Sequence, residues 1–185
     1  YSHGHLGLGK DSTYLTAYFA SHGWVVVAPG HVGEQLNGPE PMSTFYHRAT
    51  DVSEALNALD NLPDDDPLAG SVATETAFLT GHSRGTFTNW LIAGASFDMD
   101  RVAEMCANEG SIEGGCTDTE LALFEEGLGD DRFAAVAPTA GTIRRSWHGE
   151  EGHTSVQVPV MSLTGSQDTR SETATAQFDS LDGLD

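Results

Sequence analysis

Short continuous runs of apolar residues alternate along this chain with longer segments in which apolar residues recur at helical spacing. The first of the short runs is rich in β-branched residues, which is typical of a strand that is buried on both faces of a sheet, and the second is expected to be buried likewise. These runs occupy residues 24–29, 77–80, 133–137 and 158–163. The segments with helical spacing occupy residues 11–22, 47–61, 84–95 and 171–182. This alternation predicts one α/β domain, with a mostly parallel sheet and helices on both of its faces.

The first two predicted helices have recognisable ends. Asp11 or Ser12 can cap the first helix, and Gly23 follows its last residue. Pro63 and the aspartates after it stop the second helix, whose apolar residues fall on one side, namely Ala49, Val52, Ala55, Leu56 and Leu59. The aspartates at 64–66 are interpreted as a solvated turn, because the ligand spacing of a calcium loop is absent.

Residues 96–131 break this rhythm, and we expect them to form a cap-like insertion beside the functional site. They contain several acidic residues and one short helical stretch around residues 120–126. Cys106 and Cys116 flank a Gly-rich, polar stretch, which favours a disulfide that closes the loop. Such a disulfide would stabilise the fold by roughly 2–3 kcal/mol and would indicate an oxidising compartment. Two free, buried cysteines are the alternative, and a zinc site lacks further ligands.

The charge of the chain narrows the range of partners. The sequence has 8 Lys and Arg residues against 28 Asp and Glu residues, which gives a formal net charge of −20. Such a surface repels nucleic acid and anionic lipid, so neither is expected as a partner. Solubility and adaptation to salty surroundings can each explain the acidic surface. No run approaches the roughly 18 apolar residues that a membrane-spanning helix needs, so no membrane span is expected.

The sequence GHSRG at residues 81–85 lies between a predicted strand and a predicted helix. It satisfies the G-x-S-x-G pattern in the setting that the pattern requires, a tight turn that lifts a serine hydroxyl above the edge of a sheet. Side chains at the two glycine positions would collide with the neighbouring strand and helix. Backbone N–H groups at the start of the helix would face developing negative charge. We therefore predict a nucleophilic Ser83, with an ordinary strand-to-helix turn as the alternative.

A serine hydroxyl is a weak nucleophile on its own, so it needs a base and an acid that orients the base. At a turn of this kind the acid follows a later strand of the sheet. Asp168 meets this condition, because it follows the predicted strand 158–163 and a Gly-Ser turn. A plain turn or helix-capping aspartate is the alternative.

An oxyanion hole needs two N–H donors. Arg84 would supply one from its backbone, since it follows the nucleophile directly. His5 would supply the other from its backbone, because YSHGHLG at residues 1–7 looks like the loop after an earlier strand. A metal pair of His3 and His5 is the alternative, but the remaining histidines offer no matching partner motif, and no metal site is expected.

Together these residues resemble the α/β-hydrolase fold, and more narrowly the bacterial esterases related to dienelactone hydrolase and platelet-activating-factor acetylhydrolase. The resemblance rests on SHG at residues 2–4, HGWVVVAPGH at 22–31, GHSRG at 81–85 and GSQD at 165–168. It spans nearly the whole chain, and it specifies the fold well and the substrate poorly. Polyester-degrading, cutinase-like enzymes share the same layout. By this analogy Trp147 could form a wall of the acyl pocket, and a buried structural tryptophan is the alternative.

The sequence departs from the family pattern at the catalytic base. In the family a histidine follows the acid, but no histidine follows Asp168 in this sequence. We therefore expect the chain to be an internal piece of a longer hydrolase, without the first strands, the last strand and the catalytic histidine. Two alternatives are His148 or His153 acting as the base, and a non-catalytic homologue that has kept the fold.

The resemblance and the motifs imply a serine hydrolase that cleaves carboxylic esters through an acyl-enzyme, without a metal or organic cofactor. A non-catalytic binding domain is the main alternative, and polyester hydrolases, thioesterases and acyltransferases use the same constellation. The partner would be a small or polymeric ester, and the net negative field favours neutral or cationic esters over anionic ones. The predicted disulfide and the single lysine favour a periplasmic or secreted bacterial protein. The sequence does not indicate an oligomeric state.

Overall fold

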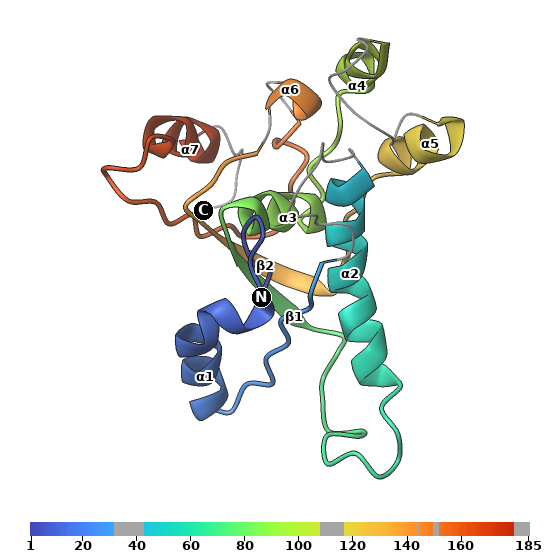
Figure 1. Ribbon diagram of the computed structural model, residues 1–185, viewed down its shortest axis with the longest axis vertical. Coiled ribbons are helices and arrows are strands. Elements are labelled where there is room, and N and C mark those ends of the chain that lie inside the picture. The colour runs from blue at the N-terminus through green and yellow to red at the C-terminus, as the bar shows by residue number, and fades with distance from the viewer. Residues whose placement is uncertain (32–42, 108–116, 144, 150–151, 180–185) are drawn as a thin grey trace.

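The computed structural model describes residues 1–31, 43–107, 117–143, 145–149 and 152–179, and within them it is a mixed α/β structure (Figure 1). The elements in chain order are η1 (Gly9–Ser12), α1 (Thr13–Ser21), α2 (Ser43–Asp60), β1 (Ala77–His82), α3 (Arg84–Ile92), α4 (Met99–Ala107), α5 (Asp118–Glu126), β2 (Phe133–Thr139), α6 (Arg145–His148) and α7 (Ser171–Asp179). Each of the four predicted helices and two of the predicted strands are therefore confirmed, with shifted ends.

The regular part of the sheet consists of β1 and β2, which run parallel. Ala77 pairs with Phe133 and His82 pairs with Thr139, so the two strands end level with each other. Buried and exposed positions alternate along β1, and Phe78 is 55% exposed. The expectation that this strand is buried on both faces is therefore wrong, because α3 covers one face, whereas Phe78 on the other face stays largely exposed beside the ring of Trp24.

Extended segments continue the sheet on both sides of these two strands. Ser2 forms a parallel bridge with Gly81, and residues 160 and 163 form parallel bridges with β2. The N-terminal ammonium of Tyr1 donates to the carbonyl of Val27 at 2.6 Å, whereas the N–H of Ser2 donates to Thr80. Successive N–H groups of an extended chain point to opposite sides. The spatial order is therefore residue 27, residues 1–3, β1, β2 and residues 160–163.

The prediction of a doubly buried strand at residues 24–29 is wrong. Trp24 is 52% exposed and Val25 is 42% exposed, and the segment has no regular strand assignment. Among the described residues, the bond from Tyr1 to Val27 is the segment's one backbone hydrogen bond to the sheet. A single bond does not make a ladder, so the run is extended without forming a complete strand. The predicted strand 158–163 likewise pairs with β2 through isolated bridges rather than a full ladder.

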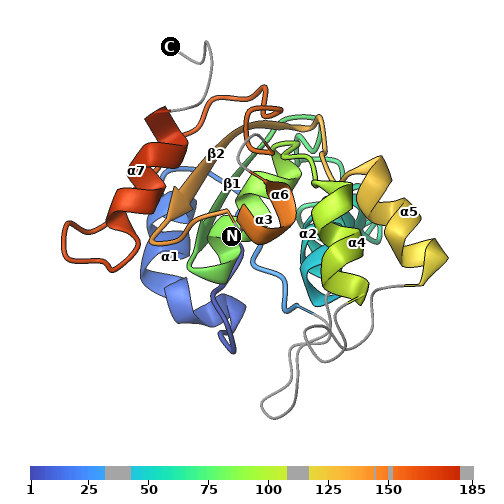
Figure 2. The ribbon, with the colours of Figure 1, turned by 90° about the horizontal axis from the view of Figure 1, so that it is seen from above.

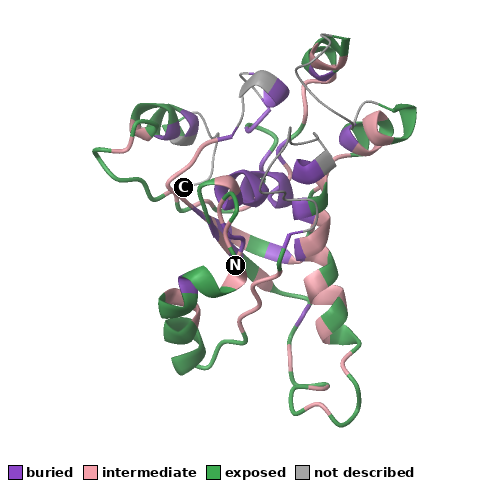
Figure 3. Ribbon diagram, viewed as in Figure 1, coloured by how far each residue is buried: buried purple, intermediate pink, exposed green. Residues whose placement is uncertain are grey.

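Helices lie on both sides of the sheet, with α1 and α7 on one side and α2 and α3 on the other (Figure 2). The packing is much tighter on the second side, where α3 contacts both strands and every residue from Gly85 to Ile92 is buried. Figure 3 shows this concentration of buried residues around α3. In contrast, α1 has no buried residue, and Tyr14 on it is 79% exposed.

The predicted insertion at 96–131 carries two helices. The expected helix around residues 120–126 is α5, which begins at a capping box formed by Thr117 and Glu120. Its neighbour α4 was not expected, although its Val102 is fully buried. Cys106 at the end of α4 is disulfide-bonded, and Cys116 lies outside the described residues, so the predicted pairing of the two stays a prediction.

Candidate functional site

Ser83 lies between β1 and α3 in a backbone conformation that residues other than glycine seldom adopt. Its φ is 55° and its ψ is −110°, which costs on the order of 1–3 kcal/mol and persists only where the surrounding structure enforces it. The Ser83 N–H donates to the carbonyl of Thr139, and the Ser83 carbonyl accepts from the N–H of Thr86, each at 3.0 Å. Ser83 is exposed and its side chain does not cap α3. The turn thus holds this residue above the end of the strand.

The surroundings of this turn are too crowded for a side chain at position 81 or 85, so both positions require glycine. A Cβ added at Gly85 would lie 2.0 Å from the carbonyl oxygen of Ser2, and one added at Gly81 would lie 2.7 Å from the backbone of Gly85. Both distances are shorter than any real contact of a Cβ atom. The collisions expected from the sequence are therefore present, with the segment at residues 1–3 as the neighbouring strand and the start of α3 as the neighbouring helix.

The strand order reverses next to Ser83. From residues 1–3 the chain first runs to residue 27 on one side, and it later returns to β1 on the other side. In open α/β sheets, ligands bind in the crevice outside the carboxyl ends of the strands at such a point. Gly4 and Ser83 leave the sheet here, and a Cβ added at Gly4 would lie 3.4 Å from the Cβ of Ser83. The topology alone therefore marks this place as a candidate site.

The structure brings both predicted oxyanion segments to Ser83. Arg84 is the first residue of α3, and its guanidinium lies over the ring of Phe45, 5.2 Å from the centroid. His5 follows Gly4 in a tight turn that is closed by a bond from the N–H of Gly7 to the carbonyl of Gly4, at 3.1 Å. The roles of the His5 and Arg84 N–H groups as oxyanion donors stay predictions.

Asp168 leaves the sheet at the same edge as Ser83. Leu163 bridges Thr139, and Thr139 pairs with His82, so the three residues lie level across the sheet. Two strand spacings separate the first from the last, or about 10 Å. The half-buried Asp168 also accepts a bond from the N–H of Arg170 at 2.8 Å through Oδ1. The alternative role in a turn is therefore present, and a role as the catalytic acid stays a prediction.

Neither His148 nor His153 forms a hydrogen bond to Ser83 in the structure's described residues. His148 is 1% exposed, and its Nδ1 donates to the carbonyl of Ser96 at 2.7 Å. Burial lowers the pKa of His148 from 6.5 to about 4, so the ring is neutral near pH 7. His153 is also 1% exposed, with its ring near the edge of Trp90. Both rings are core groups here, which disfavours either of them as the base.

Trp147 is part of the aromatic core. It is 3% exposed, and its ring meets the rings of Phe45 and Phe87 edge to face, at 4.6 and 5.7 Å between centroids. This is the structural alternative of the two that the sequence left open. A substrate can reach Trp147 only after the core has moved.

A buried polar network beside the site was not anticipated. His31 Nε2 lies 2.9 Å from the Oγ of Ser2, and His31 Nδ1 lies 3.0 Å from the Oδ2 of Asp51. Burial lowers the pKa of His31, so its neutral form is favoured. The connectivity is that of a Ser-His-Asp triad, but Ser2 is 0% exposed and also accepts a bond from Arg48. A substrate cannot reach this serine, so the network supports the fold rather than acting as a nucleophile.

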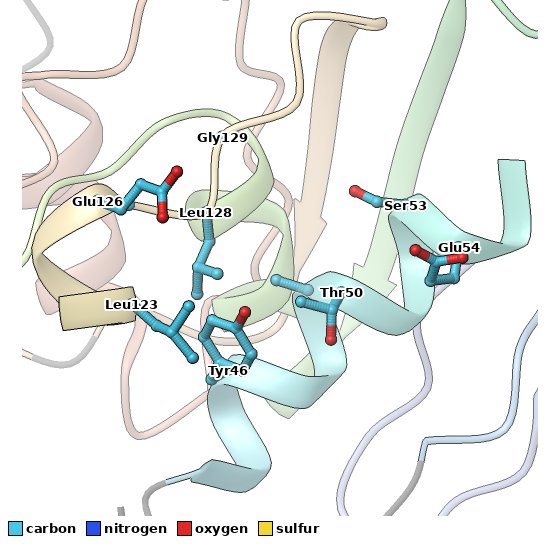
Figure 4. A pocket seen from close by; sticks show the side chains of 10 residues that line it. Tyr46, Thr50, Ser53, Glu54, Leu123, Glu126, Leu128 and Gly129 are labelled. Atoms are coloured by element: carbon cyan, nitrogen blue, oxygen red, sulfur yellow. The ribbon is translucent and has the colours of Figure 1, made fainter. Parts of the chain in front are cut away.

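Two cavities lie away from Ser83. The first, of about 240 Å³, lies between α2 and the end of α5 (Figure 4), and the second, of about 550 Å³, is lined by residues 96–98 and by residues between 148 and 155. Neither is lined by Gly4, Ser83 or Asp168. In the described part of the chain no cluster of three or more His, Cys, Asp or Glu residues could hold a metal ion.

No helix within the described ranges is both long enough and apolar enough to cross a membrane. No protein-family model matches the chain, and the comparison with curated proteins gives no match either.

Proposed function

We propose that this protein is a serine hydrolase of the α/β-hydrolase fold that cleaves carboxylic esters through an acyl-enzyme. The observation that carries the proposal is the exposed Ser83, held at positive φ between β1 and α3 at the point where the strand order reverses. Strained, non-glycine backbone of this kind concentrates at functional sites. Open α/β sheets also bind their ligands outside the carboxyl ends of the strands at such a reversal of strand order.

In the proposed reaction the Oγ of Ser83 attacks the ester carbonyl carbon while its proton passes to a histidine. The carbonyl oxygen becomes an oxyanion, which the N–H groups of His5 and Arg84 stabilise. Collapse of the tetrahedral intermediate breaks the bond to the alkoxide, which takes the proton from the histidine. Water then attacks the acyl carbon while the histidine takes a proton from it, and the bond to Oγ breaks, which releases the carboxylic acid and returns the proton to Ser83.

Asp168 orients the histidine in this scheme. It follows Leu163, which lies two strand positions from His82, and in the proposal an imidazole ring lies between the carboxylate of Asp168 and the hydroxyl of Ser83. His148 is disfavoured as this histidine, because its Nδ1 is bonded to the carbonyl of Ser96 in the core. The acidic surface favours neutral or cationic esters as substrates, because it opposes the approach of anions.

The test is hydrolysis of p-nitrophenyl acetate by the full-length protein. We expect Ser83→Ala to lower kcat by a factor of about 10⁴ or more, because the nucleophile is lost. Ser71→Ala is the matched control, since Ser71 is an exposed turn residue away from the site and should turn over substrate like the parent. Absence of hydrolysis by the parent would instead support a non-catalytic binding domain, and equal, measurable rates in the parent and Ser83→Ala would overturn Ser83 as the nucleophile.

A further inference from the structure

Arg48 on α2 is a fully buried arginine next to the proposed site. Its side chain is 0% exposed and bridges three parts of the fold. Nε donates to the Oγ1 of Thr88 on α3 at 3.1 Å, and Nη2 donates both to the Oγ of Ser2 at 3.1 Å and to the carbonyl oxygen of His3. Burying a guanidinium costs several kcal/mol unless its donors are satisfied, so these bonds are needed to hold it there.

The bonds of the network run in one consistent direction. A carboxylate only accepts hydrogen bonds, so Nδ1 of His31 donates to Asp51 and leaves Nε2 as an acceptor. The hydroxyl of Ser2 accepts from Arg48 and can therefore donate its hydrogen to Nε2 of His31. The charge of Arg48 is thus linked through Ser2 and neutral His31 to the carboxylate of Asp51.

The bond from Arg48 to the His3 carbonyl restrains the loop that faces Ser83. Because a peptide group is planar, holding the His3 carbonyl also fixes the plane of the His3–Gly4 peptide. A Cβ added at Gly4 would lie 3.4 Å from the Cβ of Ser83, and His5 follows Gly4. The guanidinium therefore sets the orientation of the backbone directly before the proposed oxyanion donor.

We infer that Arg48 is a positioning residue, which holds the His3–Gly4 peptide so that the N–H of His5 faces the oxyanion formed at Ser83. This inference rests on the proposed function and adds to it a residue that touches no substrate. A donor that is misoriented loses part of the 100-fold to 1000-fold effect that one oxyanion donor typically has on kcat. The interaction exists only in the transition state, so KM should change little.

The experiment measures kcat and KM for p-nitrophenyl acetate with Arg48→Met and Arg48→Lys in the full-length protein. We expect Arg48→Met to lower kcat by about 10-fold to 100-fold, with KM within about 2-fold of the parent. Arg48→Lys should recover part of the loss, because an ammonium can reach the His3 carbonyl but lacks the fixed fork of a guanidinium. Arg132→Met is the matched control, since it removes an arginine that bonds Asp130 and Asn57 but lies outside this loop.

The outcomes separate the inference from the proposed function. A folded Arg48→Met protein with the kcat of the parent overturns the inference, as does a loss in kcat of the same size in Arg132→Met. If Arg48→Met does not fold, Arg48→Lys decides, and a kcat equal to that of the parent overturns the inference. A parent that neither hydrolyses the ester nor reacts at Ser83 identifies a failure of the proposed function, with which the inference also falls.

Discussion

Replacement of Gly85 by alanine tests the packing that forms the turn at Ser83. The new Cβ would lie 2.0 Å from the carbonyl oxygen of Ser2, whereas ordinary contacts begin at 3.4 Å, so that oxygen has to retreat by about 1.4 Å. The same oxygen accepts a hydrogen bond from the N–H of His82 at 3.2 Å, which a shift of this size would break. Overpacking costs about 1–3 kcal/mol and the lost bond about 1 kcal/mol, so Gly85→Ala should destabilise the protein by about 2–4 kcal/mol.

Urea unfolding of the parent and the variant measures this difference directly. Gly30→Ala is a suitable control, because Gly30 is exposed and a Cβ there would meet nothing within 4 Å. Its stability should stay within about 0.5 kcal/mol of the parent. If Gly85→Ala is as stable as Gly30→Ala, residues 1–3 do not pack on α3 as described, and the reason given for the GHSRG pattern is refuted.

Three further predictions concern titration and charge. Burial lowers the pKa of His148 from 6.5 to about 4. The free energy of unfolding should therefore be fully retained above pH 6.5 and fall by about 3 kcal/mol as the pH drops to 4. The fall should be smaller in His148→Gln, which has no imidazole to protonate. The hydrogen bond from Arg132 lowers the pKa of Asp130 from 3.8 to about 2, so its contribution is present above pH 3.8 and lost as the pH falls to 2. Asp130→Asn should therefore cost about 1 kcal/mol in urea unfolding at pH 7 and nothing at pH 2. At low salt p-nitrophenyl acetate should give a higher kcat/KM than p-nitrophenyl hydrogen succinate, and the reverse order would contradict the role given to the acidic surface.

Local signals predicted the central unit of the fold. The apolar runs before Gly81 and from Phe133, together with the helical spacing after Arg84, correspond to β1, β2 and α3. The three elements agree with the prediction because β1 and β2 pair with each other in a continuous parallel ladder and α3 follows β1 almost directly in the sequence. The run at residues 24–29 is extended but forms one bond to the sheet, because apolar residues favour a strand and do not determine how many neighbours pair with it.

The network around Arg48 was missed because its members are far apart in the sequence. One signal was available, since Arg48 lies one helical turn before Val52 and therefore on the apolar side of the second helix. A charged residue on that side needs buried partners, but spacing alone could not identify Ser2, His3 and Thr88. Only the fold brings these residues together.

Reaction with a fluorophosphonate probe, followed by mass spectrometry of the peptides, tests the nucleophile most directly. The phosphorus of the probe is attacked by an activated serine, with loss of fluoride, and the adduct stays on that residue. We predict one adduct in the folded full-length protein, on Ser83, and none after denaturation or in Ser83→Ala. No adduct in the folded protein, or an adduct on another serine, would contradict the proposal that Ser83 is an activated nucleophile.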